Sequence, residues 1–197
     1  MSSRQRVLSI DLGTKNLAYC VLERRDSEPA TKILRWGILN VHEALSQKKS
    51  KKTPTISDLN CALQQTLANE RLEEGVDLVA IENQPAGFHK RANTKMKTLS
   101  HCIEAYMWHR LPSKKIRFVN PKSKFSFSDK DEVARVAKLR KSTERYKEHK
   151  RMACEATKRF LSGDTCELAT GLLDMWTSSK KKDDLADCLL QGLFVLA

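Results

Sequence analysis

Short apolar runs that end at polar or glycine positions make up the N-terminal part of the chain. The first run, residues 7–10, is closed by Asp11 and Gly13, and further runs follow at residues 17–23 and 32–39. Runs of this length between turn-forming residues are typical of buried strands. The pattern therefore predicts three consecutive strands with short connections, which form a β-meander.

Helical periodicity begins only after this meander. Thr55 and Asp58 have the spacing of a capping box at a helix start, and Ile56, Leu59 and Leu63 begin the apolar stripe of the helix that follows. This stripe predicts one helix packed against the sheet.

The rest of the chain alternates between strand and helix patterns. Apolar runs at residues 77–82 and 116–119 predict two further strands, and a stripe over residues 96–106 predicts a helix between them. This stripe fits core packing, and a dimer surface is the alternative. A basic helix is expected over residues 143–161, and a last helix is expected to begin near Asp183.

Two segments show no clear periodicity. Residues 46–53 are rich in lysine and are expected to form a loop, and residues 123–141 are polar and poorly patterned. The resulting order, β-β-β-α-β-α-β-α-α, predicts an α/β fold in which helices cover a mixed sheet. A length of 197 residues suits one domain with its own core, so we expect residues 1–197 to form a single domain.

Composition narrows the class of partner and compartment. The formal net charge of +12 and a pI near 9.5 favour a polyanion such as nucleic acid, although membrane-surface proteins are also basic. The six cysteines form no CxxC pair and have no zinc-finger spacing with histidine. Without a secretory signal, a transit peptide or a membrane-spanning run, we expect an intracellular protein, with a viral replication site, the nucleus and the mitochondrion all open.

Four acidic residues stand where the apolar runs stop. Asp11 ends the first predicted strand, Glu82 ends the fourth, and Asp184 and Asp187 share one face of the last helix. Ligands of open α/β sheets collect at the carboxyl ends of strands, so Asp11 and Glu82 meet there if their strands are parallel neighbours. Taken singly, each acid also fits a turn former or a partner of the helix dipole.

A group of carboxylates needs positive charge to remain ionised. Hard divalent cations with oxygen ligands, Mg²⁺ or Mn²⁺, meet this need. Two such ions can activate a water and stabilise the leaving oxygen during phosphodiester cleavage. The four acids on a basic chain therefore predict metal-dependent cleavage of nucleic acid.

Three motifs carry a family resemblance and together span nearly the whole chain. They are Ser9-Ile10-Asp11-Leu12-Gly13-Thr14-Lys15-Asn16, Ile81-Glu82-Asn83-Gln84-Pro85 and Asp184-Leu185-Ala186-Asp187. In this order they resemble the motifs of RuvC-like Holliday junction resolvases in the ribonuclease-H-like superfamily, and the details are most similar to the poxviral and fungal mitochondrial branch.

The resemblance implies a five-stranded mixed sheet, a homodimer and Mg²⁺-dependent resolution of four-way DNA junctions by paired symmetric nicks. The residues implied to hold the metals are Asp11, Glu82, Asp184 and Asp187. Asp183 is an additional acid without an assigned role. Lys124 and Lys150 lie where the family places lysines near the scissile phosphate, and Lys150 is the implied catalytic one, although it also fits a solvated position on a basic helix.

DNA contacts are expected from basic residues around these motifs. The candidates are Lys90, Arg91, Lys122, Lys124, Lys150 and Arg151. Such contacts go mainly to phosphate and make binding dependent on salt. The bacterial branch has an aromatic residue shortly after the second acid, whereas this chain has Asn83-Gln84-Pro85 there, with Phe88 as a nearby substitute.

Other functions compete with this interpretation. An actin-like ATPase needs two such domains, for which the chain is too short. A ribonuclease acting on RNA or an RNA–DNA hybrid stays open, although ribonuclease H takes its glutamate from a helix and Glu82 ends a predicted strand. A non-catalytic nucleic-acid-binding module of the same fold is the third alternative, and retention of all four acids argues against it.

Overall fold

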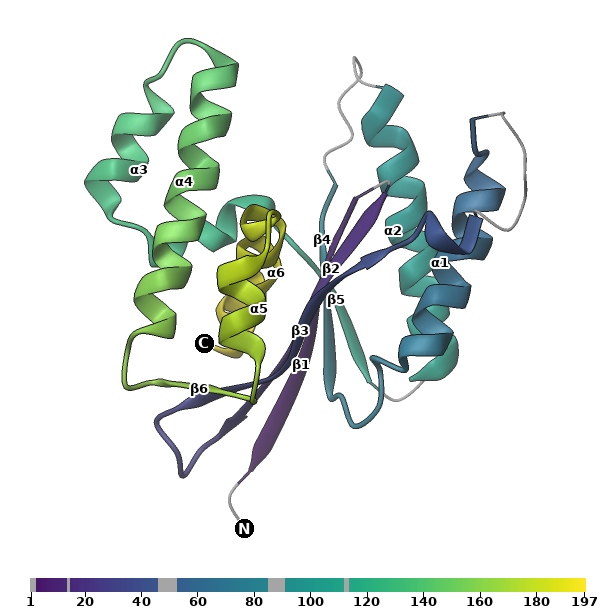
Figure 1. The fold of residues 1–197 in the computed structure, drawn as a ribbon, viewed down its shortest axis with the longest axis horizontal. Coiled ribbons are helices and arrows are strands. Elements are labelled where there is room, and N and C mark those ends of the chain that lie inside the picture. Colours follow the sequence, from purple (N-terminus) through teal and green to yellow (C-terminus); the bar gives the residue numbers. More distant parts are fainter. Residues whose placement is uncertain (1–2, 14, 46–52, 85–90, 112–113) are drawn as a thin grey trace.

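A twisted mixed sheet with helices on both faces forms the protein (Figure 1). The computed structural model describes residues 3–13, 15–45, 53–84, 91–111 and 114–197. The strands are β1 (Arg4–Leu12), β2 (Asn16–Arg25), β3 (Thr31–Asn40), β4 (Leu78–Glu82), β5 (Lys115–Val119) and β6 (Cys166–Leu168). The helices are η1 (Glu43–Leu45), α1 (Ile56–Glu70), α2 (Arg91–Arg110), η2 (Pro121–Phe127), α3 (Lys130–Ala137), α4 (Ser142–Leu161), α5 (Leu172–Ser178) and α6 (Lys182–Leu196).

The strand order is β5-β4-β1-β2-β3-β6. The meander β1-β2-β3 is antiparallel, β4 and β5 run parallel to β1, and β6 runs parallel to β3. The mixed α/β architecture and the five expected strands are confirmed. The expectation of a five-stranded sheet is wrong by one, because β6 adds an edge strand of only three residues, too short to show a period of two.

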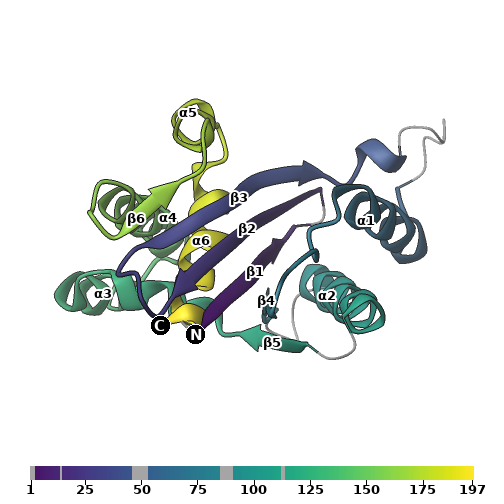
Figure 2. The same cartoon turned by 90° about the horizontal axis from the view of Figure 1, so that it is seen from below.

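Helices α1 and α2 cover one face of the sheet, and α4, α5 and α6 cover the other, as the view from below shows (Figure 2). Side chains of a strand point alternately to the two faces. In β1, Leu8 and Ile10 pack on the α1–α2 face, whereas Val7 packs on the α6 face. In β4, Val79 and Ile81 likewise belong to the α1–α2 face. The same alternation directs the acid at the end of each strand toward α6.

Helix α6 lies unusually close to the sheet. Gly192 allows this approach, because a Cβ there would lie 2.8 Å from Cδ1 of Leu22 and 3.1 Å from Cβ of Ser9. One residue earlier, buried Gln191 donates hydrogen bonds from Nε2 to the carbonyl oxygens of Ile10 (3.1 Å) and Ala80 (3.2 Å). These contacts hold α6 across β1 and β4, one turn away from Asp187.

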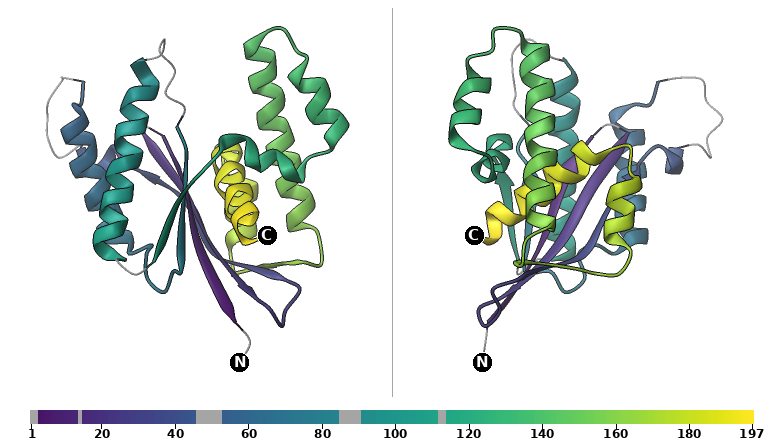
Figure 3. Two further views of the ribbon diagram at one scale, coloured as in Figure 1. Left: turned by 180° about the vertical axis from the view of Figure 1, so that it is seen from behind. Right: turned by 60° about the vertical axis from the view of Figure 1, so that its left-hand side comes forward.

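Residues 123–141 were expected to lack regular structure, but the structure has two helical segments there. The segment contains most of η2 and all of α3, whose N-cap Asp129 accepts a hydrogen bond from the amide of Glu132 at 2.9 Å. Helices α3 and α4 form a hairpin on the α6 side of the sheet (Figure 3). The short helix α5 was also not predicted, because seven residues are too few to establish a stripe.

Other expectations are met in detail. Thr55 and Asp58 form the capping box of α1, and the stripe on α2 is core, with Leu99, Ile103 and Met107 buried against the sheet. Most of the lysine-rich stretch at residues 46–53 lies outside the described residues. Within the described part of the chain, no helix is both long and apolar enough to cross a bilayer.

Candidate active site

Asp11 and Glu82 meet because of the register between two parallel strands. The pairing of β1 with β4 places Ile10 opposite Ile81, so the next residue on each strand is an acid. The two carboxyl groups are within hydrogen-bonding reach of each other. The expected convergence of strand-ending acids at this edge is therefore found between Asp11 and Glu82.

The environment of Asp11 opposes a negative charge. Burial raises the pKa of Asp11 well above its ordinary value, and the nearby charges of Glu82 and Asp187 raise it further. The ammonium group of Lys124 acts in the opposite direction without cancelling these effects. A carboxyl group in this setting is protonated more readily than a free aspartate unless additional positive charge is supplied.

The ammonium group of Lys124 is the positive charge that contacts these acids. It lies in η2, which follows β5 directly and is capped by Asn120, whose side chain accepts from the amide of Lys122 at 2.9 Å. Nζ of Lys124 donates a hydrogen bond to Oδ2 of Asp187 and lies 4.0 Å from Oε1 of Glu82. Burial acts to lower the pKa of Lys124, but the charges of Asp187 and Glu82 outweigh it, so the pKa is raised.

Asp187 reaches the same point from α6. Burial raises its pKa to about 6, the charge and hydrogen bond of Lys124 oppose this, and Glu82 and Asp183 raise it further. Its position depends on Gln191, which anchors the next turn of α6 to β1 and β4. Sequence reasoning missed Gln191, and a polar residue within the apolar stripe of the last helix was the signal available.

The other two acids of α6 have different partners. Asp184 lies with Oδ2 3.7 Å from Nζ of Lys181, and burial followed by the charge of Asp183 raises the pKa of Asp184. Asp183 accepts a hydrogen bond from Nζ of Lys150. Burial acts to raise the pKa of Asp183, but the hydrogen bond and charge of Lys150 lower it overall. The structure thus links Asp183, whose role was open, to Lys150.

A cavity of about 560 Å³ opens in front of these residues. Its lining includes the acids Asp11, Asp183, Asp184 and Asp187 and, paired with two of them, the lysines Lys124 and Lys150. Glu82 lies next to it, in contact with Asp11. The site therefore combines clustered carboxylates with ammonium groups in one concave space at the carboxyl ends of β1 and β4.

Gly13 shapes the entrance on the strand side. Its amide donates to the carbonyl oxygen of Asn16 at 2.7 Å, and a Cβ at Gly13 would lie 2.9 Å from that same oxygen. Only glycine fits this tight turn between β1 and β2 without moving backbone. Lys15 and Asn16, which follow, line the cavity.

The donor set suits a hard divalent cation in its chemistry. Asp11, Glu82 and Asp187 supply carboxylate oxygens in a poorly hydrated setting, which is the ligand type that Mg²⁺ and Mn²⁺ prefer. Among the described residues, no group of three potential ligands is arranged to hold an ion, and the ammonium of Lys124 lies between Asp187 and Glu82. Lys124 thus supplies part of the positive charge that this group of acids requires.

The predicted DNA-binding residues fall into three groups. Lys122, Lys124 and Lys150 line the cavity. Arg151 lies in the α3–α4 hairpin, where its guanidinium pairs with Glu132, Glu148 and Glu155. Lys90 and Phe88 lie outside the described residues, as does the side chain of Arg91, the first residue of α2.

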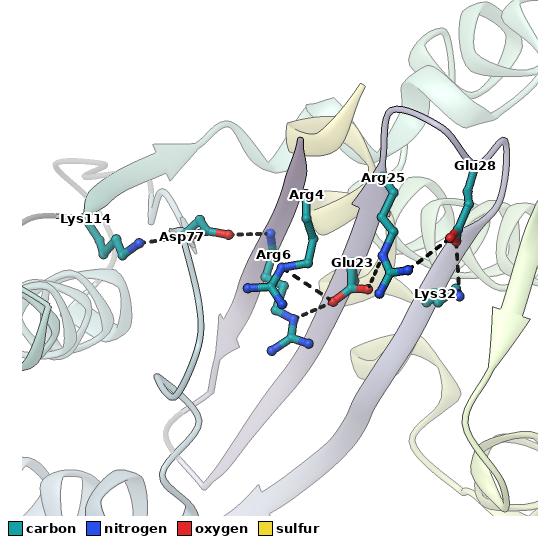
Figure 4. Close-up of polar contacts among 8 residues, drawn as sticks. All are labelled: Arg4, Arg6, Glu23, Arg25, Glu28, Lys32, Asp77 and Lys114. Atoms are coloured by element: carbon teal, nitrogen blue, oxygen red, sulfur yellow. Dashed lines mark hydrogen bonds and ion pairs between the residues drawn. The ribbon is translucent and has the colours of Figure 1, made fainter. Parts of the chain in front are cut away.

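A second charged cluster lies at the opposite ends of the same strands and has a different character. Buried Glu23 on β2 accepts from Nε of Arg6 (2.6 Å) and Nε of Arg25 (3.1 Å), with Arg4 at 4.0 Å (Figure 4). Burial acts to raise the pKa of Glu23, but these arginines lower it overall. One acid surrounded by several cations is electrostatically satisfied, so this cluster holds β1 and β2 together, whereas the acids around Asp11 lack such balance.

Comparisons with known proteins identify the family and agree with the fold. The family model described as "Mitochondrial resolvase Ydc2 / RNA splicing MRS1" matches residues 7–171. The uncharacterized protein L451 of Acanthamoeba polyphaga mimivirus is 31% identical over 131 residues, which cover 62% of this chain. The matched part is only 29% of that viral protein's length.

Solved structures of similar fold include three resolvases. The yeast mitochondrial Holliday junction resolvase Ydc2 has a TM-score of 0.65 at 20% identity, covering 96% of this chain and 79% of that one. The fowlpox virus resolvase, solved with substrate Holliday junction DNA, has a TM-score of 0.56 at 17% identity, covering 98% and 97%. T. thermophilus RuvC, solved with a Holliday junction substrate, has a TM-score of 0.56 at 10% identity, covering 98% and 94%. These likenesses show that the fold is ribonuclease-H-like.

Proposed function

This chain belongs to the family of the mitochondrial resolvase Ydc2 and the RNA-splicing protein MRS1, and on that premise we propose that it is a metal-dependent endonuclease that resolves four-way DNA junctions by paired symmetric nicks. The observation that carries the proposal is the grouping of Asp11, Glu82 and Asp187 around Lys124.

The acids favour one of the two activities that the family description joins. Binding of RNA during splicing requires basic and aromatic surfaces but no buried carboxylates. Holding Asp11 and Asp187 in a poorly hydrated place, where both pKa values rise, costs free energy of folding. Groups kept at such a cost inside a cleft are typical of a catalytic site. The site therefore favours cleavage over binding alone.

Divalent cations, with Mg²⁺ as our choice, complete this site. Asp11, Glu82 and Asp187 are the proposed ligands, with Asp184 as the fourth acid at the cavity wall. Bound ions supply activation of a water and stabilisation of the leaving oxygen at the cleaved phosphodiester. The carboxylates stand on two strands and one helix of the fold, and a bound ion would draw them together into its ligand set.

The lysines divide the remaining work. Lys124 is buried against Asp187 and Glu82 and supplies positive charge beside them. Lys150 also lines the cavity, and its hydrogen bond to Asp183 orients its ammonium. Its proposed role is to neutralise charge on a phosphate in the cavity. Because the hydrogen bond holds Lys150 in one place, the interpretation as a freely solvated lysine is less favoured.

DNA phosphates outside the cavity are held by further basic residues. Lys122 and Lys15 line the cavity and are two candidates. We retain Lys90, Arg91 and Arg151 as proposed contacts, and for Arg151 binding requires release from its ion pairs with glutamates. Contacts of this type give affinity that falls steeply as salt rises and carry no direct sequence information.

Paired nicks also require two sites in matching orientation, so we propose a homodimer. A two-fold axis presents identical cavities to two symmetric strands of a junction. The apolar stripe of α2 does not supply the contact surface, because Leu99, Ile103 and Met107 are buried in the core. The dimer surface must therefore use other residues.

The test is cleavage of labelled four-way junction, linear duplex and RNA–DNA hybrid, each with Mg²⁺ and with EDTA. We expect paired symmetric nicks in the junction by the wild type, and loss of cleavage with retained binding for Asp187→Asn and Asp184→Asn. Asp164→Asn, an exposed acid outside the cavity lining, is the matched control. Cleavage of the hybrid alone would assign the protein to the ribonucleases, and binding without cleavage would overturn the nuclease proposal.

A further inference from the structure

An exposed aromatic side chain stands at the cavity. Tyr146, in the second turn of α4, lines the cavity and has 60% of its surface exposed. Among the described residues with large exposed apolar side chains, which include Trp108 at 47%, Tyr146 has the greatest exposed fraction. An aromatic ring in water at the wall of a charged cleft contributes little to the core, so another contact has to explain it.

The ring of Tyr146 is held in place rather than left free. Nζ of Lys150 lies 4.6 Å from the ring centroid, within the range of a cation–π contact. Lys150 is itself hydrogen-bonded to Asp183 at the start of α6. One face of the ring therefore contacts Lys150, which Asp183 in turn holds in place. This restraint reduces the entropy lost when a ligand contacts the ring.

Two more rings extend this wall. Phe125 and His149 both line the cavity, and their ring centroids are 4.6 Å apart. Burial lowers the pKa of His149, and the charges of Lys124, Arg145 and Lys122 lower it further. At neutral pH His149 is therefore an uncharged aromatic ring. Tyr146, Phe125 and His149 thus place three aromatic rings among the basic groups of the cavity lining.

Aromatic faces between basic groups are the means by which proteins hold unpaired nucleotides. Bases stack on such rings, and basic side chains follow the backbone. The acids show where the phosphate must lie, because Asp183, Asp184 and Asp187 line the same cavity as Tyr146. A volume of about 560 Å³ exceeds what one phosphate needs and falls in the range of small-ligand sites.

We propose that Tyr146 stacks on an unpaired base of the nucleotide next to the cleaved phosphate, an inference that rests on the proposed function. The interaction favours binding of a substrate in which that base is already unpaired, as at the branch point of a junction. Tyr146 thereby contributes to selection of branched DNA over continuous duplex.

The test measures single-turnover cleavage of a four-way junction by the wild type, Tyr146→Ala, Tyr146→Phe and Trp108→Ala. Tyr146→Ala is expected to cleave about 5- to 150-fold more slowly, the range for loss of one base–aromatic stack. Tyr146→Phe keeps the ring and should retain most of the rate. Trp108→Ala is the control, because Trp108 is exposed near the start of β5, away from the carboxyl ends of the strands.

A second substrate separates stacking from an indirect effect through Lys150. It carries an abasic nucleotide in place of the base next to the cleaved phosphate. If Tyr146 stacks on that base, the abasic junction is cleaved slowly by the wild type and Tyr146→Ala causes no further loss. An equal loss from Tyr146→Ala on both junctions, or no loss on the intact junction, would overturn the proposal.

The proposal can also be tested if the wild type fails to cleave. A junction with 2-aminopurine at the branch point reports unstacking from its neighbours as increased fluorescence, which stacking on a tyrosine quenches. In EDTA, binding of the wild type and of Tyr146→Ala should give different fluorescence at saturation. Different signals without cleavage would reject the nuclease and keep the stacking role, whereas identical signals would reject stacking.

Discussion

Lys124 and Asp187 are 63 positions apart in the chain, yet Nζ of Lys124 donates a hydrogen bond to Oδ2 of Asp187. The contact joins η2, which follows the outer parallel strand, to α6, which crosses the sheet. It also places an ammonium 4.0 Å from Glu82. The ammonium of Lys124 therefore lowers the electrostatic cost of burying these acids together.

Loss of the ammonium should destabilise the protein without metal. Lys124→Met leaves Asp11, Glu82 and Asp187 without their cation, so we expect the free energy of unfolding in EDTA to fall by about 3 kcal/mol. Added Mg²⁺ should restore part of this loss, because it supplies charge at the same place. Lys122→Met, which removes an exposed lysine two residues away, should change stability by less than about 0.5 kcal/mol. Denaturant unfolding measures both, and equal effects of the two variants would contradict the role of Lys124.

The raised pKa of Asp187 predicts a specific dependence of stability on pH. Its folded-state pKa of about 6 lies above the ordinary value of 3.8, so the folded protein binds this proton more tightly than the unfolded chain. The stabilisation is fully present below about pH 4 and is lost as pH rises through about 6. In EDTA the wild type should therefore lose stability relative to Asp187→Asn between about pH 4 and 7, on the order of 3 kcal/mol. Parallel stability curves for the two proteins would rule this out.

Metal binding should remove most of that pH dependence. A divalent cation favours the ionised carboxylates, so wild-type stability with Mg²⁺ should rise toward neutral pH relative to EDTA. Thermal unfolding at fixed ion concentration measures this shift. Asp187→Asn should show a much smaller increase, and an equal increase in both proteins would place the ion elsewhere.

The buried amide of Gln191 should matter for both stability and activity. Gln191→Met keeps the length of the side chain but leaves the carbonyl oxygens of Ile10 and Ala80 without this donor. We expect a loss of about 1–3 kcal/mol, together with slower junction cleavage because α6 carries Asp187. Gln64→Met on the exposed face of α1 is the matched control and should be near neutral. Unchanged cleavage despite lower stability would show that Gln191 stabilises the fold without positioning Asp187 for catalysis.

The cluster around Glu23 should affect stability but not activity. Glu23→Gln removes the charge that Arg6 and Arg25 share, so we expect a loss of about 1–3 kcal/mol in stability. Cleavage per folded molecule should stay at the wild-type rate, because Glu23 lies at the far ends of β1 and β2. A slower rate at a temperature where the variant is fully folded would show that the two ends of the sheet are coupled.

The sequence by itself determined the parts of this protein that depend on local pattern. The apolar runs that stop at Asp11 and Glu82 placed each acid at the end of a strand. That the two acids meet depends on the parallel pairing of β1 with β4, which the sequence left as a condition. The capping box of Thr55 and Asp58 and the stripe of α2 were also readable. Each of these features is encoded within a few residues, because backbone geometry alone decides which side chains share a face.

Only the tertiary structure decided which distant residues meet. Among 36 lysines and arginines, nothing local distinguishes Lys124 as the partner of Asp187, or Lys150 as the partner of Asp183. The hydrophobic periodicity of the sequence likewise did not predict edge strand β6 or the aromatic side chains that line the cavity around Tyr146. Their positions follow from how closely α6 approaches the sheet at Gly192 and how α4 packs on α6. Such contacts depend on the fit of whole elements against each other, which a period along one element does not encode.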